Sequence, residues 1–81
     1  MRITVRVFAR LRELAGAGEL VRDVAPGTSV ADVWRALQHE FPGMAPYARS
    51  VSAAVNAEFA RMDTRLSDGD EVAFLPPVSG G

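Results

Sequence analysis

A single amphipathic helix is the feature that most constrains how this chain can fold. Apolar residues recur at helical intervals between residues 30 and 41 and form one stripe. They are Val30, Val33, Trp34, Leu37 and Phe41. Ser29 and Asp32 have the spacing of a capping box at the helix start, and Pro42-Gly43 ends the pattern. Because one helix cannot bury its own stripe, the rest of the chain must supply the surface that covers it.

The segments around this helix predict that the covering surface is a β-sheet. Residues 2–8 alternate between polar and β-branched side chains, with Ile3, Val5 and Val7 on one face. The other predicted strands are residues 19–24, 51–55, 59–60 and 71–75, and Val72 and Phe74 share one face of the last. Residues 10–15 predict a short helical turn that Gly16 stops, and residues 44–49 predict one irregular turn.

This order of elements predicts an α+β fold. We expect a β-grasp (ubiquitin-like) architecture, with a mixed sheet of four to five strands and one main helix packed on one face. The 81 residues fit one small domain. We assign residues 1–75 to this domain and residues 76–81 to a flexible C-terminal Gly-Gly tail.

Composition excludes several classes of function. There is no cysteine, which rules out disulfides, thiolate metal sites and cysteine nucleophiles. The 9 basic and 10 acidic side chains give a net charge of −1, a poor match to the phosphates of nucleic acid. No apolar run approaches the roughly 20 residues that cross a bilayer. We therefore expect a cytoplasmic protein that binds neither nucleic acid nor membrane.

The last six residues point to function. Pro76-Pro77 favours an extended path beyond the last strand, and Gly80-Gly81 lacks the Cβ atoms that would clash in a narrow tunnel. Six extended residues reach at most about 20 Å. A frayed terminus is the alternative interpretation of this segment.

Four segments of the chain carry a resemblance to a known family. They are Phe8-Ala9-Arg10-Leu11-Arg12-Glu13-Leu14, Ala54-Val55-Asn56, Asp68-Gly69-Asp70-Glu71-Val72-Ala73-Phe74 and Pro76-Pro77-Val78-Ser79-Gly80-Gly81. In these segments, and over its whole length, the chain resembles the MoaD-type sulfur carriers, the small subunits of molybdopterin synthase.

The resemblance implies a carrier cycle for the terminal carboxylate. An adenylating, E1-like partner uses ATP and Mg²⁺ to activate Gly81, and a persulfide donor then supplies sulfur to give a thiocarboxylate. The synthase large subunit receives the thiocarboxylate and uses its sulfur to convert cyclic pyranopterin monophosphate into molybdopterin, within a heterotetramer. The chain itself is then a non-catalytic, sulfur-donating subunit that binds no cofactor or metal.

The resemblance also implies roles for individual residues. The carboxyl group of Gly81 is the one that reacts, and Gly80 leaves room because it has no side chain. The extended segment that enters the partner, called the leash below, consists of Pro76, Pro77, Val78 and Ser79. Phe59 and Leu75 match hydrophobic subunit contacts, and we expect Leu75 to be exposed in the free protein. Core packing is the alternative role for Phe59. Arg12 matches an arginine that pairs with an acidic group of the adenylating enzyme, and a solvated surface charge is its alternative.

Other interpretations stay open from the sequence. A β-grasp sulfur carrier of another pathway, such as the thiamine thiazole type, shares the Gly-Gly chemistry, and a ubiquitin-like modifier or an inert interaction module has the same architecture. Lysine is absent as well as cysteine, which either protects an activated terminus from internal attack or reflects an arginine-biased composition. Asp68, Asp70 and Glu71 suggest a cation site, but we expect the two aspartates to cap the backbone of a turn.

Overall fold

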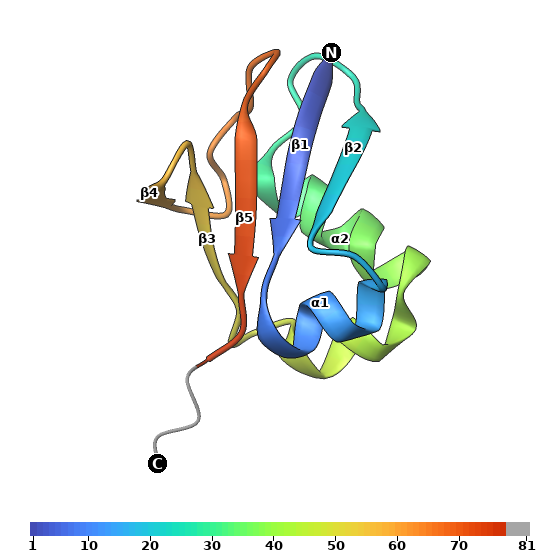
Figure 1. Cartoon of the computed structure of the whole chain (residues 1–81). Coiled ribbons are helices and arrows are strands. Elements are labelled where there is room, and N and C mark those ends of the chain that lie inside the picture. Colours follow the sequence, from blue (N-terminus) through green and yellow to red (C-terminus); the bar gives the residue numbers. More distant parts are fainter. Residues whose placement is uncertain (78–81) are drawn as a thin grey trace.

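The computed structural model describes residues 1–77, which form a five-stranded sheet with one main helix packed on one face (Figure 1). The strands are β1 (Arg2–Val7), β2 (Glu19–Asp23), β3 (Ser52–Val55), β4 (Glu58–Ala60) and β5 (Glu71–Leu75). The helices are α1 (Ala9–Ala15), the main helix α2 (Val30–Glu40) and the 3₁₀ helix η1 (Pro42–Tyr47). The predicted α+β class and each predicted strand are confirmed, and the irregular turn is η1.

The strands lie in the order β2-β1-β5-β3-β4. β1 pairs antiparallel with β2 and parallel with β5, while β3 pairs antiparallel with both β5 and β4. The sheet is therefore mixed, and its only parallel pair lies between the first and last strands. Because β1 and β5 run the same way, their carboxyl ends emerge at the same end of the sheet, beside α1 (Figure 1).

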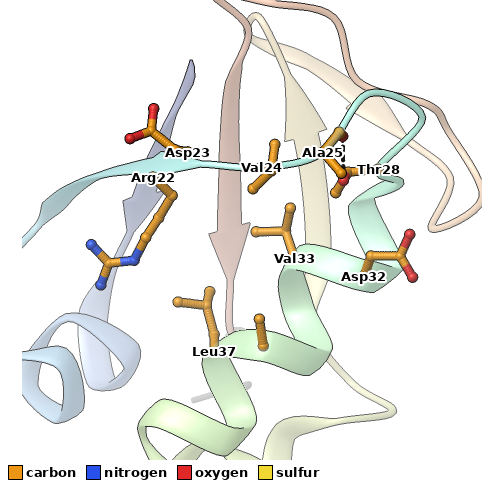
Figure 2. A pocket seen from close by; sticks show the side chains of 9 residues that line it. Arg22, Asp23, Val24, Ala25, Thr28, Asp32, Val33 and Leu37 are labelled. Atoms are coloured by element: carbon orange, nitrogen blue, oxygen red, sulfur yellow. Dashed lines mark hydrogen bonds between the residues drawn. The ribbon is translucent and has the colours of Figure 1, made fainter. Parts of the chain in front are cut away.

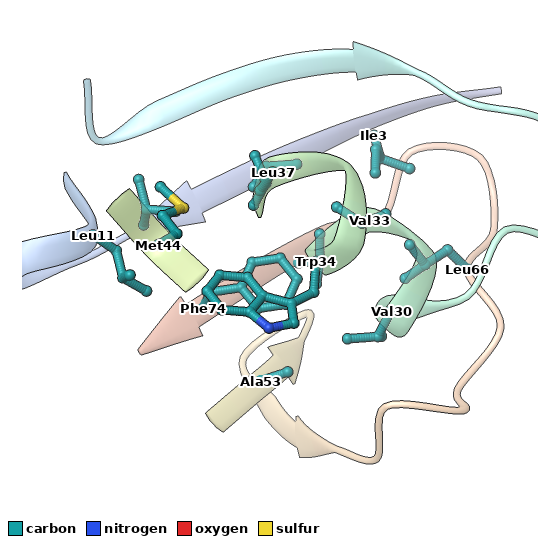
Figure 3. Close-up of a cluster of buried hydrophobic side chains, with 13 residues drawn as sticks. Ile3, Leu11, Val30, Val33, Trp34, Leu37, Met44, Ala53, Leu66 and Phe74 are labelled. Atoms are coloured by element: carbon teal, nitrogen blue, oxygen red, sulfur yellow. The ribbon is translucent and has the colours of Figure 1, made fainter. Parts of the chain in front are cut away.

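The core fills the space between α2 and the sheet. On the sheet side the buried residues are Ile3, Val5, Val7, Ala53, Val72 and Phe74. On the helix side they are Val30, Val33, Trp34 and Leu37, and Leu11 and Met44 close one end. The rings of Trp34 and Phe74 lie 5.1 Å apart between their centroids (Figure 3). The single amphipathic stripe thus packs on the alternating faces of the strands, as its sequence predicts.

Local signals set where the two α-helices begin and end. Ser29 Oγ accepts from the Asp32 N–H, and the Asp32 carboxylate accepts from the Ser29 N–H, so the predicted capping box is formed. The hydrogen bond from the Ser29 backbone, with further help from its hydroxyl and from Arg35, lowers the pKa of Asp32. Gly16 ends α1 with φ 76°, a left-handed value that suits a residue without Cβ.

A strained two-residue turn joins β3 to β4. Asn56 and Ala57 have φ values of 51° and 72°, as a type I′ hairpin turn requires. The Asn56 side chain is held because it donates to Asp70 Oδ1 and accepts from the Glu71 N–H. The side chain of Ala57 cannot form hydrogen bonds of this kind, and its Cβ is sterically unfavourable in the left-handed region.

The acidic turn before β5 binds the backbone, as expected. Asp68 accepts from the Arg2 N–H and Asp70 accepts from the Ser67 N–H, so both carboxylates hold the turn against its neighbours. None of the helices in residues 1–77 is long and apolar enough to cross a membrane.

Replacing Ala57 with glycine should stabilise the protein. Glycine adopts the observed φ without a steric penalty, so we expect Ala57→Gly to raise the free energy of unfolding by about 1 kcal/mol. The control is Ala36→Gly on the exposed face of α2, which should lower it by about 1 kcal/mol. Urea denaturation measures both, and a loss of stability in Ala57→Gly would show that the turn is not strained.

The capping box should make stability depend on pH. A carboxylate whose pKa is lowered by folding stabilises the native state above its ordinary pKa of about 3.9, and this contribution disappears as pH falls through the lowered value. We therefore expect the melting temperatures of the wild type and Asp32→Asn to differ most near pH 7 and to converge in strong acid. A difference independent of pH between 7 and 2 would contradict this role for Asp32.

Candidate docking face and tail root

The face of the sheet opposite α2 carries an apolar surface that no helix of residues 1–77 covers. A row of side chains crosses four strands on this face, because Arg6 pairs with Ala73, Ala73 with Ala54, and Ala54 with Phe59. Leu75 and Phe8 lie two residues further along β5 and just beyond β1 on the same face. We call Phe8, Ala54, Phe59, Ala73 and Leu75 the docking face.

The shape of the docking face follows from its residue sizes. Phe59 is 84% exposed and stands on the short edge strand β4. The small side chains of Ala54 and Ala73 form a low floor between Phe59 and Arg6. An exposed aromatic beside a shallow apolar floor is typical of a surface that a partner covers.

Phe59 and Leu75 differ in how far they match their predictions. The exposure of Phe59 excludes core packing within the described residues, and its interface role stays a prediction. The expectation that Leu75 is exposed is wrong, because its side chain is half-buried. Leu75 still pairs with Ser52 inside the sheet, and this neighbouring strand shields part of it.

We call Pro76 and Pro77 the tail root. The tail root lies at the edge of the docking face. Pro76, which is half-buried, and Pro77, which is exposed, follow directly from β5. Val78, Ser79, Gly80 and Gly81 lie outside the described residues. Because β1 and β5 are parallel, the root emerges beside Phe8 and α1, at one end of the sheet (Figure 1).

A polar cleft of about 320 Å³ lies between the end of β1, the start of β2 and α1. It is lined by Arg6, Val7, Phe8, Arg12, Gly18 and Glu19. The Arg12 side chain is exposed and passes close over Gly18, where a Cβ would come within 3.2 Å of its Nε. Within residues 1–77 no carboxylate lies within ion-pair distance of Arg12. The guanidinium of Arg12 is therefore exposed and unpaired within the described residues, and its role toward an adenylating enzyme stays a prediction.

Arg10 does not present its charge in the same way. Its Nη1 donates to Glu13 Oε2 at 2.9 Å, and this hydrogen bond raises the pKa of Arg10 further above its ordinary value. Of the two arginines of α1, only Arg12 has no carboxylate partner within residues 1–77.

A second, more apolar groove lies away from the tail root, between the end of β2 and α2. Val24, Val33 and Leu37 lie along this groove, which has a volume of about 320 Å³ (Figure 2). Two charged side chains that line this groove already form ion pairs. Arg22 pairs with Glu40 at 2.7 Å and Asp32 pairs with Arg35 at 3.1 Å. The groove is on the helix side of the sheet and takes no part in the docking face.

Sequence patterns alone did not single out Arg6, Phe8, Ala54 or Ala73 as site residues. The alternation of residues 2–8 places Arg6 and Phe8 on the face away from the core, but the pattern does not tell which other strands lie beside them. Only the pairing of β1 with β5 and of β5 with β3 brings these residues together.

Comparisons with known proteins identify the family of the chain. The ThiS family model matches residues 5–81. The chain belongs to the ThiS family. It is 41% identical to the molybdopterin synthase sulfur carrier subunit of Escherichia coli, covering 98% of this chain and 99% of that one. It is 37% identical to the protein of the same name from Mycobacterium tuberculosis, covering 100% and 99% of the two chains.

Solved structures of ThiS-like proteins confirm the β-grasp fold. The crystal structure of SAMP1 from Haloferax volcanii superposes with a TM-score of 0.86 at 29% identity, covering 100% of both chains. A protein-protein complex of subunits 1 and 2 of the molybdopterin-converting factor from Helicobacter pylori contains a chain that matches with a TM-score of 0.70 at 26% identity, again over 100% of both.

The exposure of Phe59 predicts that this side chain adds little to stability. We expect Phe59→Ala to change the free energy of unfolding by less than about 0.5 kcal/mol, as for other surface substitutions. The matched control is Phe74→Ala, which removes a fully buried ring and should cost about 3–5 kcal/mol. Urea denaturation compares the two, and a large loss in Phe59→Ala would show that its ring packs on the domain.

Proposed function

We propose that this chain is the sulfur carrier subunit of molybdopterin synthase and that the carboxyl group of Gly81 carries the sulfur. The observation that carries the proposal is the position of the tail root, which leaves β5 at the edge of an apolar docking face with Phe59 exposed on it. A partner that covers this face also receives the tail. The full-length relatives named molybdopterin synthase sulfur carrier subunit support this pathway over thiazole synthesis or protein modification.

The chemistry starts at an unreactive group. A free α-carboxylate has a pKa of about 3.3–3.7, so at neutral pH it is ionised and resists nucleophiles. In the activating step, a carboxylate oxygen of Gly81 attacks the α-phosphate of ATP on an adenylating enzyme, and pyrophosphate leaves. Sulfide sulfur then attacks the acyl carbon and AMP leaves, which gives the thiocarboxylate. When a persulfide is the donor, a thiol must also cleave the remaining S–S bond.

The domain contributes positioning to this cycle. Docking through Phe59, Leu75 and their neighbours fixes the tail root on the partner, so the terminal group reacts as if the step were intramolecular. Pro76 and Pro77 restrict the first residues of the leash, which lowers the entropy lost when the tail enters a tunnel. The acid, base and pterin-binding groups belong, in this proposal, to the large subunit, and the reaction takes place in the cytoplasm.

Intact mass spectrometry tests the proposal. We expect incubation with an adenylating enzyme, ATP, Mg²⁺ and inorganic sulfide to raise the mass of the chain by the difference between one sulfur and one oxygen atom. Adding the large subunit and cyclic pyranopterin monophosphate should then restore the original mass and produce molybdopterin. An unchanged mass with an enzyme that activates a known carrier would refute the proposal.

Two tail variants serve as controls for the site of reaction. Deleting Gly81, or adding one residue after it, should abolish sulfur transfer while the melting temperature stays that of the wild type. Transfer that persists in either variant would show that the sulfur is not carried by the Gly81 carboxyl group.

A further inference from the structure

Arg6 is a charged residue at one end of the row that crosses the docking face. It lies on β1, on the face away from α2, beside Ala73 of β5 and Glu19 of β2. Its side chain is 45% exposed, and because it adjoins Ala73 of the docking face, a partner seated there would also cover its guanidinium. The row Arg6, Ala73, Ala54 and Phe59 makes this coverage continuous, because the two alanines between the ends of the row are too small to hold a partner away.

Among the contacts within residues 1–77, Arg6 makes no side-chain hydrogen bond, which leaves its donors free there. The nearest carboxylate oxygen, Glu71 Oε1, lies 3.8 Å from Arg6 Nη1, which is beyond hydrogen-bond distance. Its Cζ lies 5.5 Å from the centroid of the Phe8 ring, a cation–π contact that steadies one face of the guanidinium. The planar edges of the guanidinium, where its N–H groups point, remain available to an acceptor.

Covering a guanidinium with apolar surface reduces the free energy gained on binding. A guanidinium that loses its water and gains no acceptor keeps an uncompensated buried charge. A carboxylate matches the fork of N–H donors in arginine, and a bidentate pair restores the lost hydrogen bonds. Arg12 lines the same cleft from α1, and the carboxylates near these two guanidinium groups are Glu19 in the cleft lining and Glu71, 3.8 Å from Arg6.

We propose that Arg6 is a recognition residue for the large subunit and that the partner places a carboxylate against it when the docking face is covered. The inference rests on the proposed function. The large subunit is the chosen partner because a related carrier fold forms a complex with the second subunit of the converting factor. The cation–π contact with Phe8 holds the guanidinium in place before binding, which reduces the side-chain entropy lost in the complex.

Binding of the unmodified carrier to the large subunit of the same organism tests this pairing without any sulfur chemistry. We expect Arg6→Met to weaken binding about 30-fold or more, because the partner carboxylate is then buried without its counter-charge. Arg6→Lys should recover only part of the loss, because it keeps the charge and loses the bidentate fork. An unchanged or tighter complex with Arg6→Met would overturn the inference, since it would show that the partner offers no acceptor.

Arg2 provides the matched control. It lies on the same strand and the same face, roughly 13 Å away at 3.3 Å per residue, and pairs with Asp23 at the far end of the sheet. Arg2→Met removes one positive charge as well and should change affinity by less than about threefold. An equal loss in both variants would mean that net charge, and not recognition at Arg6, governs binding.

A double-mutant cycle with Glu71 separates recognition from internal structure. Glu71→Gln removes the internal counter-charge of Arg6 and should leave the complex as tight or tighter. If Glu71→Gln weakens the complex as much as Arg6→Met and the double variant is no weaker, Arg6 acts only through the internal pair and the inference is wrong.

Two further outcomes are distinct. A wild-type carrier that fails to bind the large subunit overturns the proposed function, and this inference with it. Wild-type binding to the large subunit with an effect of Arg6→Met only on the adenylating enzyme overturns this inference alone.

Discussion

The parallel pairing of β1 with β5 is the interaction on which the rest of the structure depends. It joins the first and last strands of the domain at its centre, with Val5 beside Val72 and Val7 beside Phe74. All four side chains are buried, and α2 packs over them. Because the two strands run in one direction, the same pairing that builds the core also brings the tail root next to Phe8 and the start of α1. Stability and delivery of the tail thus rest on one set of contacts.

The two faces of the sheet differ in the size of the side chains that they carry. The inner face holds large side chains such as Phe74, whose ring packs against Trp34 of α2. The outer face has alanines at the matching positions in β3 and β5, and its large groups stand at the margins. This division allows a partner to approach the sheet closely without disturbing the core. The free energy of docking can therefore come from Phe59 and its neighbours while the stability of the domain is independent of them.

Most of the fold follows from local sequence patterns, and the site follows from them only in part. The stripe of α2, its capping box and the alternation in β1 and β5 were sufficient to predict the α+β class and the face on which the helix packs. The exposure of Leu75 was misjudged, because alternation assigns a side chain to a face but does not tell how much its neighbours cover it. Arg6 was not identified as a site residue, since a charged residue on an outward-facing position resembles any solvated surface charge until the strands beside it are known.

The sequence by itself determined the element order, the capping of α2, the acidic turn before β5 and the Gly-Gly segment that suggests a carrier. These depend on residues close together in the chain, where propensity, spacing and short-range hydrogen bonds act. Only the tertiary structure decided that Arg6, Ala73, Ala54 and Phe59 form one row and that the tail root opens beside it. These residues are far apart along the chain, and strand register, which long-range burial of the core imposes, is what makes them neighbours.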